Sequence, residues 1–118
     1  TPVCCALSHD NNGQLLNTNA DTIAAEIAKA MSADFTSILN FCFELNGVLR
    51  DIKDPNSVIE KITPALLKEL TEKGIISEGM LPKLHNAFAA IAQGVSEVAI
   101  GSTKMINTNV PYTSIKQQ

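Results

Sequence analysis

The sequence holds 118 residues, of which 45% are hydrophobic and 18% charged, and its formal net charge is −3 at pH 7. This length corresponds to about one domain, and a two-domain enzyme does not fit within it. The acidic balance gives no reason to expect nucleic acid or an anionic membrane as a partner. No apolar run reaches the roughly 18 residues of a membrane helix, and no secretory signal pattern occurs, so we expect a cytoplasmic protein.

The first residues predict a β-hairpin. Residues 2–7 form an apolar run typical of a buried strand, and residues 8–13 are dense in turn formers, with Asn12-Gly13 the strongest signal. Residues 14–17 then return as a second strand. A natural chain would begin with Met, so this strand-like start indicates a piece of a longer protein.

The first helix is predicted to begin after Asn19, a favourable N-cap, with Asp21 in its first turn. It ends near residues 32–33. Its apolar positions repeat at helical spacing: Ile23, Ala24, Ile27, Ala28 and Met31. Residues 35–43 follow as a buried strand, which Asn46-Gly47 ends.

Two more helices follow a polar loop at residues 50–56. Thr63-Pro64 marks the start of one, and Gly74 its end. The next helix runs from residues 79–80 to about residue 93, before strands at residues 95–100 and 112–115. Strands that alternate with helices in this way predict an α/β domain with a mostly parallel sheet.

The cysteines are three in number, and two of them are adjacent. Cys4, Cys5 and Cys42 all lie in apolar stretches, and no CxxC or closely spaced histidine pair accompanies them. We therefore expect buried thiols in a reducing compartment, and no metal ligands among these residues.

One candidate site lies where the hairpin leads into the first helix. Asn17, Asn19 and Asp21 place two amides and a carboxylate within five residues. Strand-to-helix junctions are where α/β folds bind ligands. The alternative is that Asn19 only caps the helix and that Asp21 only complements the helix dipole.

A second candidate site is the glycine-flanked loop of residues 74–83, where Lys83 falls in the first turn of a helix. A cation there opposes the helix dipole by about 0.3–1 kcal/mol. A phosphate bound at the helix N-terminus would reverse this penalty, because the backbone N–H groups and Lys83 would both favour it. The alternative is a solvated surface lysine. No Walker or dinucleotide-binding glycine motif occurs.

These segments resemble motifs of the acetylglutamate kinase family, within the wider amino-acid kinase fold. Residues 17–21 resemble its N-x-N-A-D motif, and residues 44–49 resemble its D-V-x-G-V-L loop, with Glu44 in place of the usual Asp. Residues 74–83 resemble G-[VI]-I-[ST]-x-G-M-x-P-K at a helix start. The similarity covers about residues 1–100.

The resemblance implies a three-layer α/β/α sandwich in which residues 1–118 are the C-terminal ATP-binding domain of the kinase. It implies ATP-dependent phosphorylation of the side-chain carboxylate of N-acetyl-L-glutamate, or of another N-acylglutamate, in arginine biosynthesis, with ATP and Mg²⁺ as cofactors. The N-terminal half of such an enzyme is absent here. We therefore expect that half as a partner, a homo-oligomer as the assembly, and no activity from this chain alone.

The resemblance also assigns roles by position. Lys83 becomes the catalytic lysine on the ATP phosphates, Asp21 the catalytic carboxylate that orients lysines, and Asn17 and Asn19 contacts to the acylglutamate. The positions that match nucleotide-binding ones are Glu44, Leu45, Asn46, Gly47, Val48, Leu49, Ile75, Ile76, Ser77 and Met80.

Two alternatives stay open. A related amino-acid kinase could act on free glutamate or aspartate, although the Asn17 motif argues against it. A non-catalytic binding or assembly module could also use the same fold. The segment 101–111 is too short for the further helix that the family usually has before its last strand, so either this part is reduced or residues are missing between Ile100 and Tyr112.

Overall fold

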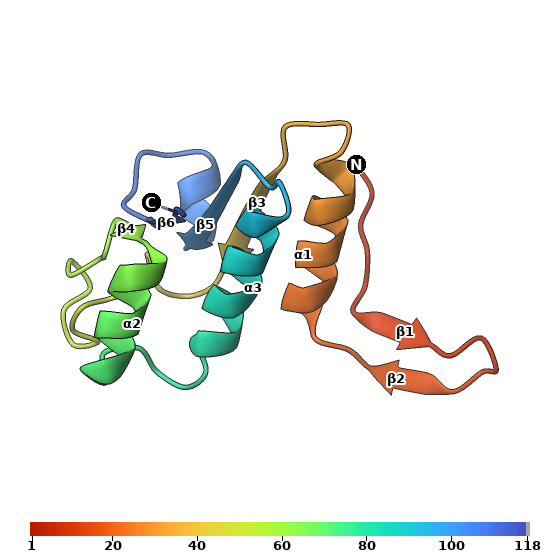
Figure 1. Ribbon diagram of the computed structural model, residues 1–118, viewed down its shortest axis with the longest axis horizontal. Helices are drawn as coiled ribbons and strands as arrows, with labels where there is room; N and C mark the ends of the chain where they lie inside the picture. Colours follow the sequence, from red (N-terminus) through yellow and green to blue (C-terminus); the bar gives the residue numbers. More distant parts are fainter. Residues whose placement is uncertain (118) are drawn as a thin grey trace.

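A computed structural model describes residues 1–117. Its elements are shown in Figure 1 and follow in chain order: β1 (Leu7–His9), β2 (Leu15–Asn17), α1 (Ala20–Met31), β3 (Ile38–Cys42), β4 (Lys61–Ile62), α2 (Pro64–Glu72), α3 (Leu81–Ala92), β5 (Glu97–Gly101), the 3₁₀-helix η1 (Thr103–Ile106) and β6 (Thr113–Ile115). Among these residues, every helix is too short or too polar to cross a membrane.

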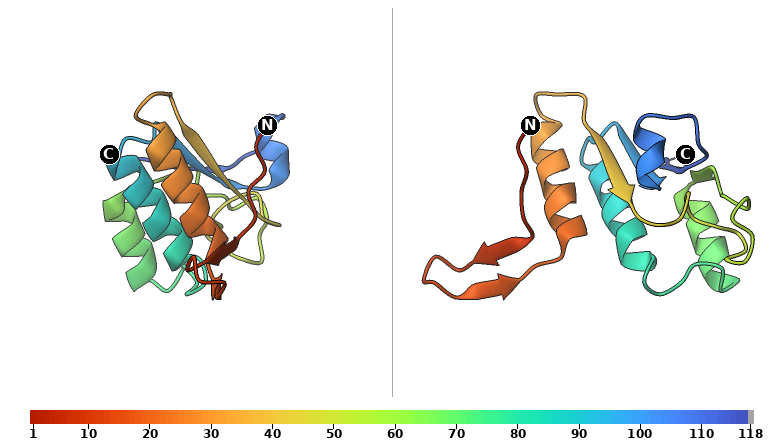
Figure 2. Two further views of the ribbon diagram at one scale, coloured as in Figure 1. Left: turned by 90° about the vertical axis from the view of Figure 1, so that its right-hand side faces the viewer. Right: turned by 180° about the vertical axis from the view of Figure 1, so that it is seen from behind.

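Four of the strands form one sheet in the order β3-β5-β6-β4. β3 pairs with β5 and β4 with β6 in parallel, whereas β5 and β6 are antiparallel. All three α-helices lie on one face of this sheet, and η1 lies on the other (Figure 2). The predicted α/β class and mostly parallel sheet are confirmed. In the described residues, the helical layer on the second face is reduced to η1, in keeping with the short segment after Gly101.

The helices begin and end where the sequence places their caps. The Asn19 side chain accepts a hydrogen bond from the Asp21 N–H at 2.8 Å, and Thr63 accepts one from the Leu66 N–H at 3.3 Å. Gly74 and Gly94 follow α2 and α3 with φ of +68° and +101°, the left-handed conformation that favours glycine after a helix. Ile62, Leu70, Leu84, Val98, Ile100 and Ile115 fill the space between helices and sheet.

The predicted hairpin is present, but its first strand lies further along the chain than expected. β1 pairs antiparallel with β2, and the Asp10 carboxylate accepts hydrogen bonds from the Asn12 and Gln14 N–H groups in the turn. The hairpin projects away from the helices and the sheet (Figure 1). The prediction of a buried strand at residues 2–7 is therefore wrong, because residues 2–6 are exposed and pair with no strand in the described part of the chain.

The burial of α1 and of the cysteines also differs from expectation. Ala25 and Ala28 are buried, whereas Ile27 and Met31 are 45% and 46% exposed. The reason is that α1 lies beside β3, which is the edge strand, and that only residues 2–6 lie along its outer side, where they leave an open hollow. All three cysteines are exposed, so the expectation of buried thiols is wrong.

Candidate functional site

The candidate site lies at one edge of the sheet. β3 and β5 run parallel, so their carboxyl ends meet at the same edge. α1 precedes β3 and α3 precedes β5, and each helix returns across the sheet before its strand (Figure 1). The N-termini of both helices therefore lie at the carboxyl edge, where open α/β sheets bind ligands.

An ion pair joins the two helix N-termini. Lys83 Nζ lies 2.6 Å from Asp21 Oδ2, although the residues are 62 positions apart in sequence. Both side chains are partly buried, at 18% and 31% exposure. The same ammonium lies 5.0 Å from the centre of the buried Phe41 ring, within range of a cation–π contact. The structure thus brings the two predicted catalytic residues together and places the lysine ammonium over a buried aromatic ring.

Local charges at this edge favour an anion. The start of α3 has no side-chain cap. Of its first backbone N–H groups, those of Met80 and Leu81 donate to the Ser77 carbonyl and Pro82 has none, which leaves the Lys83 N–H to face a ligand. Asp21 balances the single positive charge of Lys83. The N-terminal dipoles of the two helices add partial positive charge to this balanced pair, so the edge as a whole is positive. Asn19 lies beside this pair but uses its side-chain oxygen to cap α1, and Asn17 is exposed at the end of β2. The arrangement can therefore hold a polyanionic ligand such as a phosphate chain.

The loop after β3 carries six of the residues predicted to bind nucleotide. Glu44 is exposed, Leu45 and Asn46 are half-buried, and Gly47, Val48 and Leu49 are buried. Only the first half of this loop, residues 44–46, thus offers side chains at the surface, and the second half anchors the loop in the core.

The second segment predicted to bind nucleotide lies before α3, and it also contains both buried residues and residues at the surface. Ile76 is buried at 7% exposure, Ile75 and Met80 are partly buried, and Ser77 is exposed. The Ser77 side chain donates no hydrogen bond within residues 1–117, but its carbonyl accepts from the Met80 and Leu81 N–H groups and so shapes the turn into α3. Ser77 and Met80 are therefore the members that can face a ligand.

Two residues of this edge were not predicted. Gly101 ends β5, and a Cβ there would lie 2.7 Å from the Asn46 carbonyl oxygen. Ser102 follows it, and its buried hydroxyl has no hydrogen-bond partner among residues 1–117. Their position directly after a predicted strand is the signal that could have identified them. A buried hydroxyl without a partner costs free energy, so it fits an edge where a ligand would supply polar groups.

No group of three or more His, Cys, Asp or Glu side chains that could hold a metal ion occurs in residues 1–117. The one carboxylate at the centre of the site, Asp21, is already paired with Lys83. A magnesium ion at this edge would therefore depend on the oxygens of a bound phosphate chain. Three hollows lie elsewhere on the molecule, and neither Lys83 nor Asp21 lines any of them.

The loop after β3 depends on one buried hydrogen bond. The Thr113 hydroxyl of β6 accepts from the Val48 N–H at 2.8 Å. We expect Thr113→Val to lower the free energy of unfolding by about 2 kcal/mol, because the Val48 N–H would stay buried without a partner. Thr113→Ser keeps the hydroxyl and should cost only about 1 kcal/mol for the lost methyl group. Urea denaturation would compare the two, and equal losses would contradict a role for the hydrogen bond.

Comparison with known proteins gives a consistent result. The model of the amino acid kinase family matches residues 1–102. The chain is 50% identical over 113 residues to an acetylglutamate kinase of Cytophaga hutchinsonii and 54% identical over 106 residues to one of Phocaeicola vulgatus. These alignments cover 92% and 90% of this chain but only 43% and 41% of the relatives. The solved structure of smu.665 from Streptococcus mutans superposes with a TM-score of 0.73 at 33% identity, over 96% of this chain and 41% of that one.

Proposed function

Because the chain belongs to the amino acid kinase family, we propose that residues 1–118 are the ATP-binding domain of a kinase that phosphorylates the side-chain carboxylate of an N-acylated glutamate. N-acetyl-L-glutamate is the first candidate substrate, since the relatives reported above are acetylglutamate kinases. The proposed place of this reaction is arginine biosynthesis in the cytoplasm.

The observation that carries this proposal is the pair formed by Lys83 and Asp21 between the N-termini of α1 and α3. In the proposed reaction, Lys83 contacts the phosphates of ATP and stabilises the charge that develops on the transferring phosphoryl group. Asp21 is a positioning residue that keeps the flexible lysine aimed at this point. Asn17, exposed at the hairpin end of the site, contacts the acylglutamate.

The chemistry requires little beyond this arrangement. The acceptor is already a carboxylate, so no general base has to remove a proton. The task is to hold two anions together and to neutralise charge during transfer. Mg-ATP is the natural form of the nucleotide, because the metal would be held mainly by phosphate oxygens. Residues 44–46, Ser77 and Met80 form the proposed contacts to the rest of the nucleotide.

A second part of the protein is needed for transfer in this proposal. The chain spans 41–43% of the length of the acetylglutamate kinases it matches. It also presents a hollow of about 550 Å³ between residues 2–6, α1 and β3, with Ile23, Ile27, Met31 and Ile38 among its lining residues. We propose that the remaining part packs against this face and supplies further charged groups, and that the 118 residues bind nucleotide without transferring phosphate.

Isothermal titration of this chain with Mg-ATP tests the nucleotide site. We expect Lys83→Ala to weaken the affinity about tenfold, because a charge-assisted contact to phosphate is lost. Lys68→Ala is the matched control, since Lys68 lies on α2 with its side chain 80% exposed and should leave the affinity unchanged. Equal affinities of the unchanged chain and Lys83→Ala, including no binding by either, would contradict the proposal.

A further inference from the structure

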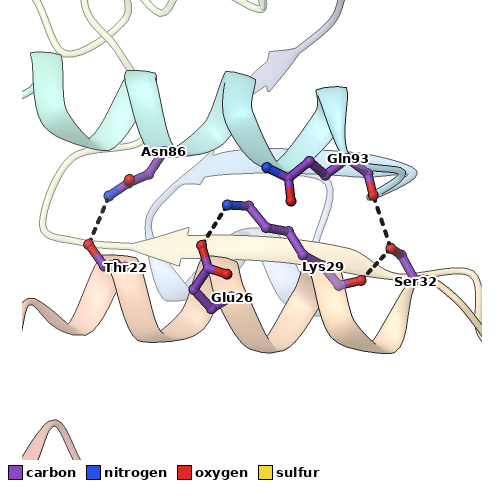
Figure 3. Close-up of polar contacts among 6 residues, drawn as sticks. All are labelled: Thr22, Glu26, Lys29, Ser32, Asn86 and Gln93. Carbon is purple, nitrogen blue, oxygen red and sulfur yellow. Dashed lines mark hydrogen bonds and ion pairs between the residues drawn. The ribbon is translucent and has the colours of Figure 1, made fainter.

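α1 and α3 lie side by side and in the same direction, and several polar contacts join them (Figure 3). Lys83 contacts Asp21, and Asn86 donates to the Thr22 hydroxyl at 3.5 Å. The Ser32 hydroxyl donates to the Lys29 carbonyl of its own helix at 2.6 Å and also lies 3.4 Å from the Gln93 carbonyl. The three contacts between the helices join residues separated by 62, 64 and 61 positions. Such similar separations mean that the two helices are parallel and hold a single register over their whole length.

The apolar part of the same interface permits this close approach. Ala25 and Ala28 of α1 and Ala87 and Ala90 of α3 are all buried. At the far end, a Cβ on Gly94 would lie 3.3 Å from the Ser32 hydroxyl oxygen. Small side chains let two helices approach closely, and they form lower ridges than larger side chains would, so the ridges interlock less deeply with the grooves of the other helix.

Polar contacts between α1 and α3 fix the relative position of the two helices, which the alanines leave unspecified. Lys29 extends from α1 toward α3, with its side chain only 13% exposed, but its ammonium pairs with Glu26 of the same helix at 2.6 Å and so does not join the two helices (Figure 3). Asn86 lies one turn after Lys83 on α3, and Thr22 follows Asp21 on α1. The Asn86–Thr22 contact is thus next to the ion pair, and it links the same two helix ends.

We propose that Asn86 and Thr22 form a register clamp, the hydrogen bond that keeps α3 from shifting along α1 and so places the Lys83 ammonium at the phosphate site. The geometry of the clamp rests on the helix contacts described above. Its expected effect on nucleotide binding rests on the proposed function. A shift of one residue along a helix corresponds to about 1.5 Å and a turn of about 100°, which would separate Lys83 from Asp21. Misplacement of this size is enough to weaken a catalytic contact strongly. Asn86 and Thr22 are positioning residues, because they act through Lys83.

The test is a double-mutant cycle between Asn86 and Lys83, measured by titration of this chain with Mg-ATP. We expect Asn86→Leu to weaken the affinity about threefold to fivefold, and to add nothing when Lys83 is already alanine. Thr22→Val should match Asn86→Leu, whereas Thr22→Ser keeps the hydroxyl and should bind like the unchanged chain. A purely structural role would instead weaken binding equally in both Lys83 backgrounds.

The inference is overturned if Asn86→Leu and Thr22→Val leave the affinity unchanged while Lys83→Ala weakens it, or if the two backgrounds respond equally. If Lys83→Ala itself has no effect, the proposed function fails, and ¹⁵N NMR of the Lys83 ammonium then decides the clamp separately. A shifted or broadened ammonium signal in Asn86→Leu and Thr22→Val, but not in Thr22→Ser, upholds it. An unchanged signal in all of these variants overturns it.

Discussion

Replacing Asp21 by asparagine is expected to slow phosphoryl transfer about a hundredfold, while the affinity for Mg-ATP falls only a few fold. Asparagine keeps the size of the side chain and its place in the first turn of α1, but it removes the charge that holds Lys83 Nζ at 2.6 Å. Lys83 would then sample other rotamers. Ground-state binding, to which many contacts contribute, suffers less than a transition state that requires the ammonium in one position.

The measurement requires a protein competent for transfer, such as a chimaera in which this chain replaces the matching segment of an acetylglutamate kinase relative. Glu26→Gln is the matched control, because Glu26 lies on the same helix and pairs with Lys29 instead of Lys83. We expect it to change kcat by less than about twofold, because the Glu26 side chain is 63% exposed and pairs of this kind contribute little. A loss of kcat in Glu26→Gln equal to that in Asp21→Asn would show that the charge of α1, and not this contact, is what matters.

The pair should also behave as one unit. Lys83→Ala alone removes the ammonium, so Asp21→Asn should cost little more in the Lys83→Ala background. Additive losses would mean that Asp21 acts on the reaction independently of Lys83, and the positioning role would then be wrong.

The same chimaera tests the substrate: transfer to free glutamate in preference to N-acetylglutamate would contradict the proposed acyl specificity.

Local signals in the sequence predicted most of the secondary structure. Asn19 and Thr63 cap their helices as expected, since an N-cap depends only on neighbouring backbone N–H groups. Gly74 and Gly94 end their helices for an equally local reason. The failure at residues 2–7 is of another kind. An apolar run forms a buried strand only if another strand pairs with it, and in the described residues no strand pairs with residues 2–6.

The site could be predicted only in part. Spacing led to the hypothesis of an anion site at the start of α3, beside the alternative of a solvated lysine, and the family resemblance made Asp21 the carboxylate that orients lysines; these roles stay predictions. No local pattern could show that these residues, 62 positions apart, lie in contact, because the parallel packing of α1 and α3 creates that contact. Asn86 was missed for the same reason: it is an ordinary polar helix residue until its neighbour on α1 is known.

The close approach of Gly101 leads to the largest stability effect we expect. A Cβ at this position would lie 2.7 Å from the Asn46 carbonyl oxygen, 2.9 Å from Met105 Sδ and 3.1 Å from the Tyr112 Cβ. The methionine can move, but the carbonyl belongs to the loop after β3 and Tyr112 adjoins β6. Gly101→Ala should therefore lower the free energy of unfolding by about 3 kcal/mol, at the upper end for overpacking a filled core.

Gly79→Ala is the matched control, since a Cβ at Gly79 meets nothing within 4 Å and its φ is not left-handed. We expect it to change stability by less than about 0.5 kcal/mol, as for an open surface position. Urea denaturation would measure both variants.

Because relief of the Gly101→Ala clash requires the Asn46 segment to move, Mg-ATP affinity should fall along with stability at temperatures where the variant is still folded. A variant that loses stability but binds Mg-ATP normally would show that residues 44–46 do not contact the nucleotide, and the binding surface would then be confined to the start of α3.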